Sequence, residues 1–467
     1  MRKFLVEIRY FFFILHNMKQ TFNFSFINLW CTKNLVDSQM LMGRILSLWV
    51  NNTNYTVQYI NDPFDKKTNI VFLNSCGFIS SARDEMMDIL RQLQKAKKQI
   101  YLIWCWLQYY KTMMPTSMER MKFKEFTNLH FLSWNDFESV TLRQLIIWYD
   151  SKTFGDFEFA NTPRAYTNAH LGFEYLKISE GCDNHCTFCI IPRIRGKQVS
   201  LSIEKILSEI ETMVHMGIQE IILIAQDTAT YGMDLYRRKP MLVELLKKID
   251  QIPGDFTYRL LYLYPDVLTK DQLKEMTKLQ KLIPYFDIPL QHISPTVLKR
   301  MGRFYHTRSI NNILSTIKKE FPLSYIRTNI MVGFPGETKE DFNQLKDYIK
   351  HSDFDHVALF EYHDEPFAAS SKLHDKIDDK EIRKRFLDLK KIVDTLLLKK
   401  EKKRKGKKET GYIMDILKKW KTEKLLVRPL LHAPEIDGYD EIGLKQVTGV
   451  FNEKNELEIG DKIVYTV

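Results

Sequence analysis

Between residues 173 and 400 the chain alternates an apolar strand with an amphipathic helix six times, and this alternation constrains the fold more than any other feature. Repeated strand–helix units form a parallel sheet with helices outside, and their right-handed connections favour a partial barrel. Such barrels carry their chemistry on loops at the carboxyl ends of the strands. The expected strands are 175–179, 220–225, 258–264, 285–290, 327–333 and 356–362, and the helices include 202–216 and 339–350.

Three cysteines follow the first expected strand of this region at the spacing C-x3-C-x2-C, and no fourth cysteine lies nearby. They are Cys182, Cys186 and Cys189. Three thiolates on one short loop can hold three irons of a 4Fe–4S cluster, whereas complete ligation by protein needs four. The spacing therefore predicts one open iron that can bind a cofactor, much as a catalytic zinc keeps an open position.

The other three cysteines lie in an N-terminal region that reads as an open α/β sheet over residues 22–150. Each follows the carboxyl end of an expected strand, and in such sheets those ends form one rim where ligands bind. We therefore expect Cys31, Cys76 and Cys105 to share one site, the alternative being three unrelated buried thiols. The expected strands are 24–29, 69–74 and 99–103, and the expected helices are 35–46 and 80–97.

The cysteine pattern also bears on the compartment. Six cysteines could form three disulfides in a small secreted domain, but this chain has 467 residues and groups half of them at ligand spacing. Thiolate ligands in a reducing cytoplasm are the better interpretation. The apolar stretch Phe4–Leu15 carries two charges, is shorter than the roughly 20 residues of a membrane span, and lacks a cleavage site. We expect residues 1–21 to be a non-native extension, with Met18 as the start, and no membrane contact.

The C-terminal part changes pattern after a long charged helix expected over 379–404. Short strands follow, which predict a small β-barrel over 401–467. The net charge is +11, and much of the excess lies in Lys399–Lys408. This charge suggests a nucleic-acid-rich partner, the alternative for the basic tail being a solvated helix face or linker. The expected strands are 411–416, 424–429, 445–452 and 461–467.

Three segments resemble motifs of the radical S-adenosylmethionine (SAM) methylthiotransferases, and the resemblance extends from Phe22 almost to the end of the chain. Asn28–Ser38 and Leu73–Ile79 are similar to the first two cluster-binding loops of that family, and Ile178–Gly196 is similar to its radical loop. The resemblance implies a methylthiotransferase domain over 22–150, a radical SAM domain over 165–400 and a TRAM-like β-barrel over 401–467.

The same resemblance implies two 4Fe–4S clusters and SAM as cofactors. In such enzymes the cluster on the three-cysteine loop binds SAM, and one electron from a reductant such as flavodoxin or ferredoxin releases a 5′-deoxyadenosyl radical that removes hydrogen from the substrate. The second cluster, on the N-terminal cysteines, carries the sulfur to be inserted. A second SAM supplies the methyl group.

Within the family, Leu223–Gly232 resembles the RimO-type branch, which modifies an aspartate of ribosomal small-subunit protein S twelve. The tRNA-modifying MiaB-type branch typically has Gly-Gln-Asn-Val at Ala225–Thr228. Further segments that fit the first branch are Pro284–His292, Ile326–Thr338 and Ala433–Gly438. The implied product is β-methylthio-aspartate. The alternatives are methylthiolation of tRNA adenosine and a non-catalytic ribosome- or RNA-binding iron–sulfur protein.

Weaker candidates for cofactor contact lie at or near strand ends. Asp227 could instead cap a helix, a lone His292 is more often structural, and the turn at Gly333 could be a plain turn. Arg195 is expected to steer an acidic group, and Phe188, between two ligands, to shield the cluster from solvent. The candidate cofactor-binding residues are Phe188, Gln226, Asp227, Gln291, Arg327 and Gly333.

Tryptophan stands at three positions where the family has glycine: Trp30, Trp104 and Trp134. Glycine serves where the backbone turns sharply or approaches a ligand closely, and an indole next to Cys31 or Cys105 would crowd a cluster loop. Either the second cluster has been altered or lost, or a reassigned codon that the cell reads as glycine has been translated as tryptophan. We favour the second hypothesis.

Overall fold

The computed structural model describes residues 22–29, 31–50, 57–78, 80–103, 105, 108–109, 123, 125–132, 164–419, 422–451 and 456–467. The chain divides into two compact units between Ala165 and Tyr166. The expected extension 1–21 and the tryptophans Trp30, Trp104 and Trp134 lie outside the described residues. None of the described helices is long and apolar enough to cross a membrane.

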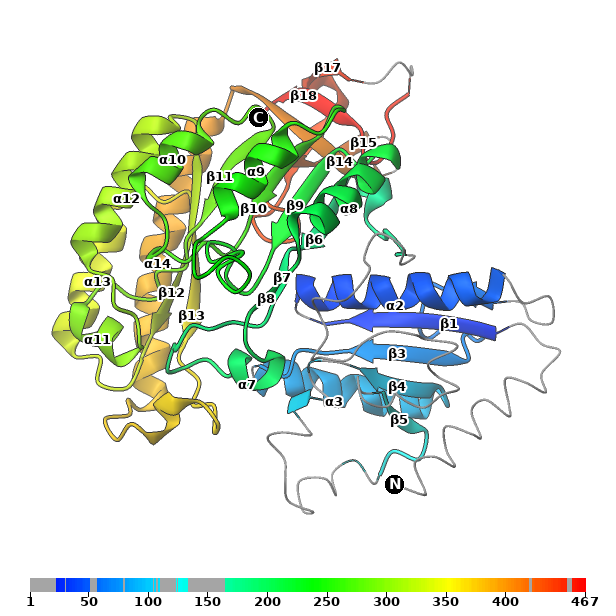
Figure 1. Ribbon diagram of the computed structural model, residues 1–467, viewed down its shortest axis with the longest axis horizontal. Coiled ribbons are helices and arrows are strands. Elements are labelled where there is room, and N and C mark those ends of the chain that lie inside the picture. Colours follow the sequence, from blue (N-terminus) through cyan, green and yellow to red (C-terminus); the bar gives the residue numbers. More distant parts are fainter. Residues whose placement is uncertain are drawn as a thin grey trace. The chain divides into compact units, whose positions relative to one another are not determined.

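The first unit is built on a parallel sheet with the strand order β2-β1-β3-β4-β5. The three strands expected from the sequence are present, and two short ones, β2 and β5, were not predicted. Helices α2 and α3 each follow one of the cysteine-bearing strand ends (Figure 1). The elements are β1 (Phe22–Asn28), α2 (Thr32–Val50), β2 (Val57–Tyr59), β3 (Ile70–Asn74), α3 (Ser80–Lys95), β4 (Gln99–Ile103) and β5 (Leu129–Leu132).

The two helices cover opposite faces of this sheet, because successive side chains of a strand point to opposite sides. Phe72 and Tyr101 pack with Leu41 of α2 in one apolar cluster. Val71 and Leu73 of the same strand pack with Leu90 of α3 in a second apolar cluster. Both faces are therefore buried, which explains why these strands are apolar throughout rather than alternating.

The second unit contains the expected partial barrel, a parallel sheet with the sequential order β6-β9-β10-β11-β12-β13. No pairing joins β6 to β13 in the part of the chain that the structure describes, so the barrel stays open. Strand β10 ends before the expected residue 264, because Tyr262 has a φ of +63°, which a strand does not accept. The strands are β6 (Phe173–Lys177), β9 (Glu220–Ile224), β10 (Thr257–Leu260), β11 (Leu282–Asp287), β12 (Tyr325–Val332) and β13 (His356–Glu361).

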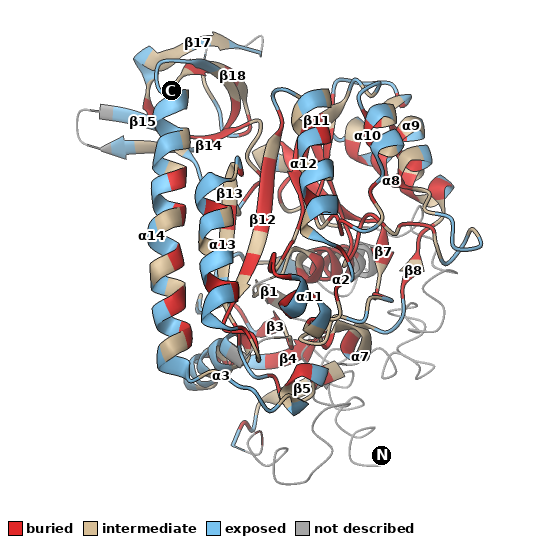
Figure 2. Cartoon of the chain, turned by 90° about the vertical axis from the view of Figure 1, so that its left-hand side faces the viewer, coloured by how far each residue is buried: buried red, intermediate tan, exposed pale blue. Residues whose placement is uncertain are grey.

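Helices connect these strands, and a side-chain oxygen caps the amino end of several, as at Ser202, Thr269, Thr338 and Asp378. The long helix buries one apolar stripe and exposes its charged side (Figure 2). A small ribbon, β7 (Ser179–Glu180) with β8 (Val199–Ser200), flanks the cysteine loop. The helices are α7 (Ile191–Arg195), α8 (Ile203–His215), α9 (Leu242–Asp250), α10 (Lys270–Met276), α11 (Pro295–Arg300), α12 (Thr307–Glu320), α13 (Lys339–His351) and α14 (Asp379–Arg404), with 3-10 turns at Ala169–Leu171, Ala369–Lys372 and Leu444–Gln446.

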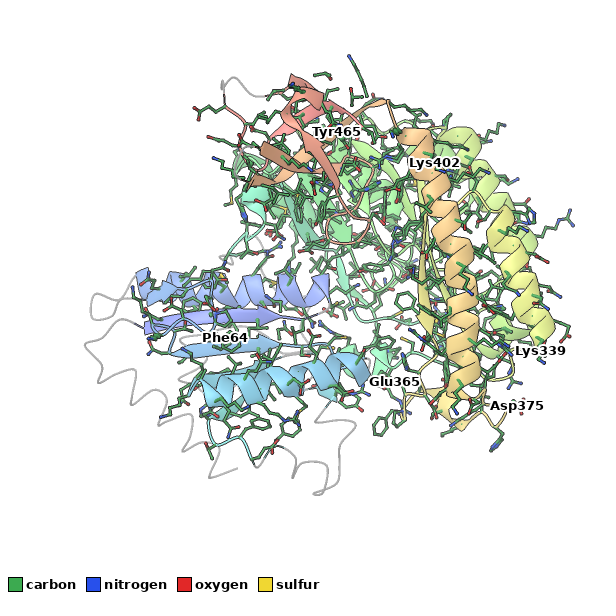
Figure 3. All side chains as sticks on the ribbon, turned by 180° about the vertical axis from the view of Figure 1, so that it is seen from behind. Phe64, Lys339, Glu365, Asp375, Lys402 and Tyr465 are labelled. Atoms are coloured by element: carbon green, nitrogen blue, oxygen red, sulfur yellow. The ribbon has the colours of Figure 1, made fainter. Side chains whose placement is uncertain are left out.

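The C-terminal antiparallel sheet belongs to the same compact unit and has the order β16-β15-β14-β18-β17. Its core includes Ile413, Val427 and Tyr465, and Tyr465 is labelled in Figure 3. Strand β18, expected over 461–467, pairs with both β14 and β17, and β16 was not predicted. The strands are β14 (Lys408–Lys419), β15 (Thr422–Pro429), β16 (Asp440–Gly443), β17 (Val447–Val450) and β18 (Lys462–Thr466).

Buried ion pairs join this sheet to the barrel. Glu220, the first residue of β9, lies 2.5 Å from Arg259 Nε and 2.7 Å from Arg428 Nη2, and all three side chains are fully buried. Tyr285 also donates to Asp437 at 2.7 Å. Since Glu220 begins its strand, the C-terminal sheet is attached at the amino ends of the barrel strands and leaves the carboxyl ends to the cysteine loop.

Candidate functional site

The loop with the C-x3-C-x2-C motif follows β7 and is anchored on both sides by backbone hydrogen bonds. Cys182 N donates to Gly196 O at 3.2 Å, and Cys189 N to Cys186 O at 3.0 Å. Thr187 N donates to Met301 O at 2.9 Å. The loop is therefore held against the segment that follows α11, at the carboxyl end of the first barrel strand.

The thiols on this loop fit a metal cluster. None of the six cysteines, all of them in described segments, forms a disulfide. Burial raises the pKa of Cys182 to about 11 and that of Cys189 to about 12, so both remain protonated until a metal displaces the proton. No three donors among the described residues converge on a single ion. A 4Fe–4S cluster does not require that, because each iron takes its own thiolate.

The three N-terminal cysteines come together in the first unit, each just past a strand end. The thiols of Cys76 and Cys105 are hydrogen-bonded to each other, and Cys31 lies within electrostatic reach of Cys76. The hydrogen bond to Cys105, followed by burial, raises the pKa of the Cys76 thiol well above its usual range. Phe78 N approaches Cys76 Sγ at 3.4 Å. The rim of this sheet thus presents a second set of three thiols.

Gln226 and Asp227 follow β9 after one intervening residue, on the same side as the cysteine loop. Asn184, from within that loop, donates to Asp227 Oδ2 at 2.7 Å, and burial raises the pKa of Asp227 to about 6. Asp227 Oδ1 also accepts from Ala229 N at 3.1 Å, as in a local turn. Gln226 Nε2 donates to Glu180 at 2.6 Å, while Gln226 Oε1 is buried and has no hydrogen-bond partner among the described residues. This orphaned oxygen is an acceptor available to a ligand.

Glu180 is a residue that sequence analysis passed over, and it organises the start of the loop. It lies 2.6 Å from Lys177 Nζ and 3.0 Å from Arg195 Nη1. Although burial acts to raise it, Arg195 and Lys177 hold the pKa of Glu180 at about 2. Arg195 was expected to steer an acidic group, and in the structure its partner is Glu180, a carboxylate of the chain itself. The available signal was Lys177, which ends a strand that is apolar apart from Glu174.

Gln291 and His292 follow β11 in an unusual backbone. Gln291 has a φ of +65°, and its N–H and C=O bond to Asn329 O and Met331 N, both at 2.7 Å. His292 is fully buried, accepts from Ser294 N at Nδ1, and places Nε2 3.7 Å from Glu337. Burial lowers the pKa of His292 to about 4, so the ring is neutral. Its contacts are those of a structural histidine.

Arg327 and Gly333 lie on β12 and just after it. The strand begins at Tyr325, not at Arg327 as expected. Arg327 Nη1 lies 2.8 Å from Asp287, and its Nε lies 3.6 Å from Asp437 in the segment between β15 and β16. Its partners are therefore internal carboxylates.

Gly333 has a φ of +81°, donates to Glu337 at 2.8 Å, and leaves no room for a β-carbon beside Ile382 of α14. This turn is shaped by the helix behind it. Phe188 packs half-buried against Val297, Met301, Phe334 and Tyr362.

Arg303 was also not singled out by the sequence. It follows Met301 and Gly302, and no local pattern in the sequence distinguishes it from Arg300 and Arg308 nearby. Its guanidinium lies 4.7 Å from the ring of Tyr264 and 5.8 Å from that of Phe188. The cysteine loop thus has a buried cation beside it.

Comparison with known families agrees with this arrangement. The radical SAM superfamily matches residues 176–349, which include the three-cysteine loop. The uncharacterized protein family UPF0004 matches residues 23–123, which include the other three cysteines. The radical SAM methyltransferase TsrM from Kitasatospora setae, solved with cobalamin and a [4Fe-4S] cluster, covers 74% of this chain and 75% of its own at a TM-score of 0.51. At 10% identity, that likeness shows the fold alone.

Curated relatives are much more similar. The ribosomal protein uS12 methylthiotransferase RimO of Carboxydothermus hydrogenoformans is 36% identical over 424 residues, which are 89% of this chain and 92% of the relative. RimO of Clostridium kluyveri is 34% identical over 450 residues, covering 94% and 93%. Similarity at this level over nearly the full length of both proteins places the chain in the family of the ribosomal protein uS12 methylthiotransferases, RimO.

Proposed function

We propose that the chain is a radical SAM methylthiotransferase that adds sulfur and a methyl group at the β-carbon of an aspartate in ribosomal protein uS12. The observation that carries this proposal is near-full-length similarity to RimO proteins. The two sets of three thiols, each at the carboxyl rim of a parallel sheet, support it.

Cys182, Cys186 and Cys189 would hold a 4Fe–4S cluster with one iron left for SAM. When both are bound, the cluster gives one electron to SAM, and SAM is cleaved to a radical that can remove hydrogen from an unactivated C–H bond. Gln226, held by Glu180, offers its buried Oε1 to a donor such as the amino group of SAM. The apolar packing of Phe188 keeps water from one side of the loop.

The remaining candidates act around the mouth of the barrel. Asp227 fixes Asn184 and hence the loop itself. The backbone turns at Gln291 and Gly333 shape the carboxyl ends of β11 and β12. Arg327, held by Asp287, orders the barrel interior below them. We assign these four residues to positioning the cofactor.

Cys31, Cys76 and Cys105 would hold the second 4Fe–4S cluster, which supplies the sulfur. The hydrogen bond between the Cys76 and Cys105 thiols supports this assignment, as does the position of each cysteine after a strand end.

We also propose that the enzyme works in the cytoplasm, draws electrons from flavodoxin or ferredoxin, and contacts the ribosome or rRNA through its basic tail. Lys400 and Arg404 of this segment are engaged in ion pairs. Other lysines there, such as Lys402 near the end of α14 (Figure 3), are exposed. Exposed lysines suit phosphate contacts, whose strength falls with salt.

Anaerobic reconstitution with iron and sulfide tests the proposal. We expect about eight irons per chain, and about four after replacing the cysteines of either set by alanine. Only the set at Cys182, Cys186 and Cys189 should be needed for release of 5′-deoxyadenosine on reduction with SAM. Mass spectrometry of uS12 and tRNA from a deletion strain should show the modification lost from the protein. Loss from tRNA alone would contradict the proposed substrate.

A further inference from the structure

Arg303 is a buried cation without a carboxylate partner in the part of the chain that the structure describes. The residue is 5% exposed, and its Nη1 donates to Pro289 O at 2.6 Å and to Tyr305 Oη at 2.9 Å. Its Nε is buried and has no hydrogen-bond partner in the described segments. Asp227 and Asp266 sense its charge, but neither forms an ion pair with it among the described contacts.

Aromatic rings keep water from the guanidinium. Its central carbon lies 4.7 Å from the ring of Tyr264 and 5.8 Å from the rings of Tyr305 and Phe188. Cation–π contact offsets part of the lost hydration. A buried charge that lacks an ionic partner is nevertheless unfavourable. We therefore expect an anion to lie beside the Arg303 guanidinium in the active protein.

Arg303 is fixed beside the cysteine loop by its own backbone neighbours. Thr187, between Cys186 and Cys189, bonds through N to Met301 O at 2.9 Å and through Oγ1 to Arg300 O at 2.8 Å. The charge of Arg303 acts on both of these cysteines. The uncompensated cation and the thiols therefore belong to one rigid arrangement.

We propose that Arg303 is the built-in counter-ion of the 4Fe–4S cluster held by Cys182, Cys186 and Cys189, and that it raises the reduction potential of that cluster. This inference rests on the proposed function. A 4Fe–4S core with three thiolates is net negative and gains one further negative charge on reduction. In a water-excluded site a nearby cation stabilises the reduced state more than the oxidised one. Arg303 is thus a positioning residue that makes electron entry easier.

The test uses the full chain with the N-terminal cysteines replaced by alanine, so that one cluster gives the signal. Arg303→Met removes the charge at similar volume, and Arg308→Met removes an exposed charge five residues along. In an EPR-monitored redox titration without SAM, Arg303→Met should lower the equilibrium constant for reduction of the cluster at least tenfold. For one electron this corresponds to a reduction potential about 59 mV lower. Arg308→Met should leave the potential unchanged.

Two further measurements separate the counter-ion from other roles. Arg303→Lys should restore most of the potential and cluster retention; if both Arg303 variants lose the cluster equally, the proposal is wrong. In cluster-free protein, Arg303→Met should unfold at the same or a higher temperature than the parent, whereas a structural role predicts a lower one.

An unchanged SAM-free potential with weakened SAM binding would make Arg303 a SAM ligand and overturn the inference. If the parent itself binds no cluster, the proposed function fails instead.

Discussion

Gly302 packs its α-carbon against the carbonyl of His185, so that a β-carbon there would lie 2.5 Å from that oxygen. Its φ of +69° is also unfavourable for any other residue. We expect Gly302→Ala to shift the cysteine loop, lowering iron content and destabilising the fold by roughly 1–3 kcal/mol. Iron analysis and chemical denaturation measure the two effects.

Gly406 is the matched control for this substitution, because its φ is +78° and nothing lies within 4 Å of the added carbon. Gly406→Ala should show backbone strain without loss of iron. Equal iron content in the two variants would contradict an anchoring role for Gly302.

Arg428 and Glu220 join the C-terminal sheet to the barrel across a fully buried contact. Arg428→Met leaves part of a buried carboxylate charge unmatched, and we expect a loss of about 3–5 kcal/mol. Denaturant unfolding measures it. The control Lys424→Met breaks a half-exposed pair with Glu441 on the same sheet and should change stability by less than about 1 kcal/mol. Similar values for both would show that the buried pair does not secure the sheet.

His292 makes stability depend on pH. Burial holds its pKa at about 4 in the folded protein, against 6.5 for the ordinary side chain. Because the unfolded chain takes up a proton first, stability is intact above pH 6.5 and falls as the pH drops from 6.5 to about 4, by up to about 3 kcal/mol. Denaturation of the wild type and His292→Gln at pH 7 and pH 5 should show a steeper loss in the wild type. Parallel losses would exclude His292 as the titrating group.

Trp30, Trp104 and Trp134 carry a prediction independent of the structure. If a reassigned codon has been read as tryptophan, peptides of the native protein should contain glycine at positions 30, 104 and 134. Mass spectrometry of protein from the source organism decides this. Tryptophan at position 30 would remove the hypothesis and favour an altered second cluster. The same protein with glycine at these positions should then retain more iron in its N-terminal domain.

Local patterns in the sequence were sufficient for the fold class and for the two sets of cysteines. A strand buried on both faces is apolar throughout, and a helix repeats its apolar side every three to four residues, so both can be recognised from neighbours alone. Cys182, Cys186 and Cys189 share one loop, and Cys31, Cys76 and Cys105 each follow a strand end. The short strands β2, β5 and β16 were not predicted, because three or four residues are too few to show the periodicity of a strand.

What only the tertiary structure decided are the contacts between residues distant in the chain. Arg327 could have faced a ligand, but Asp287 and Asp437 surround it. No local sequence pattern marks Arg303, because its role depends on contact with a loop more than a hundred residues earlier in the chain. Sequence periodicity reports which side of an element is buried, whereas the partner of a buried charge is fixed by packing between elements.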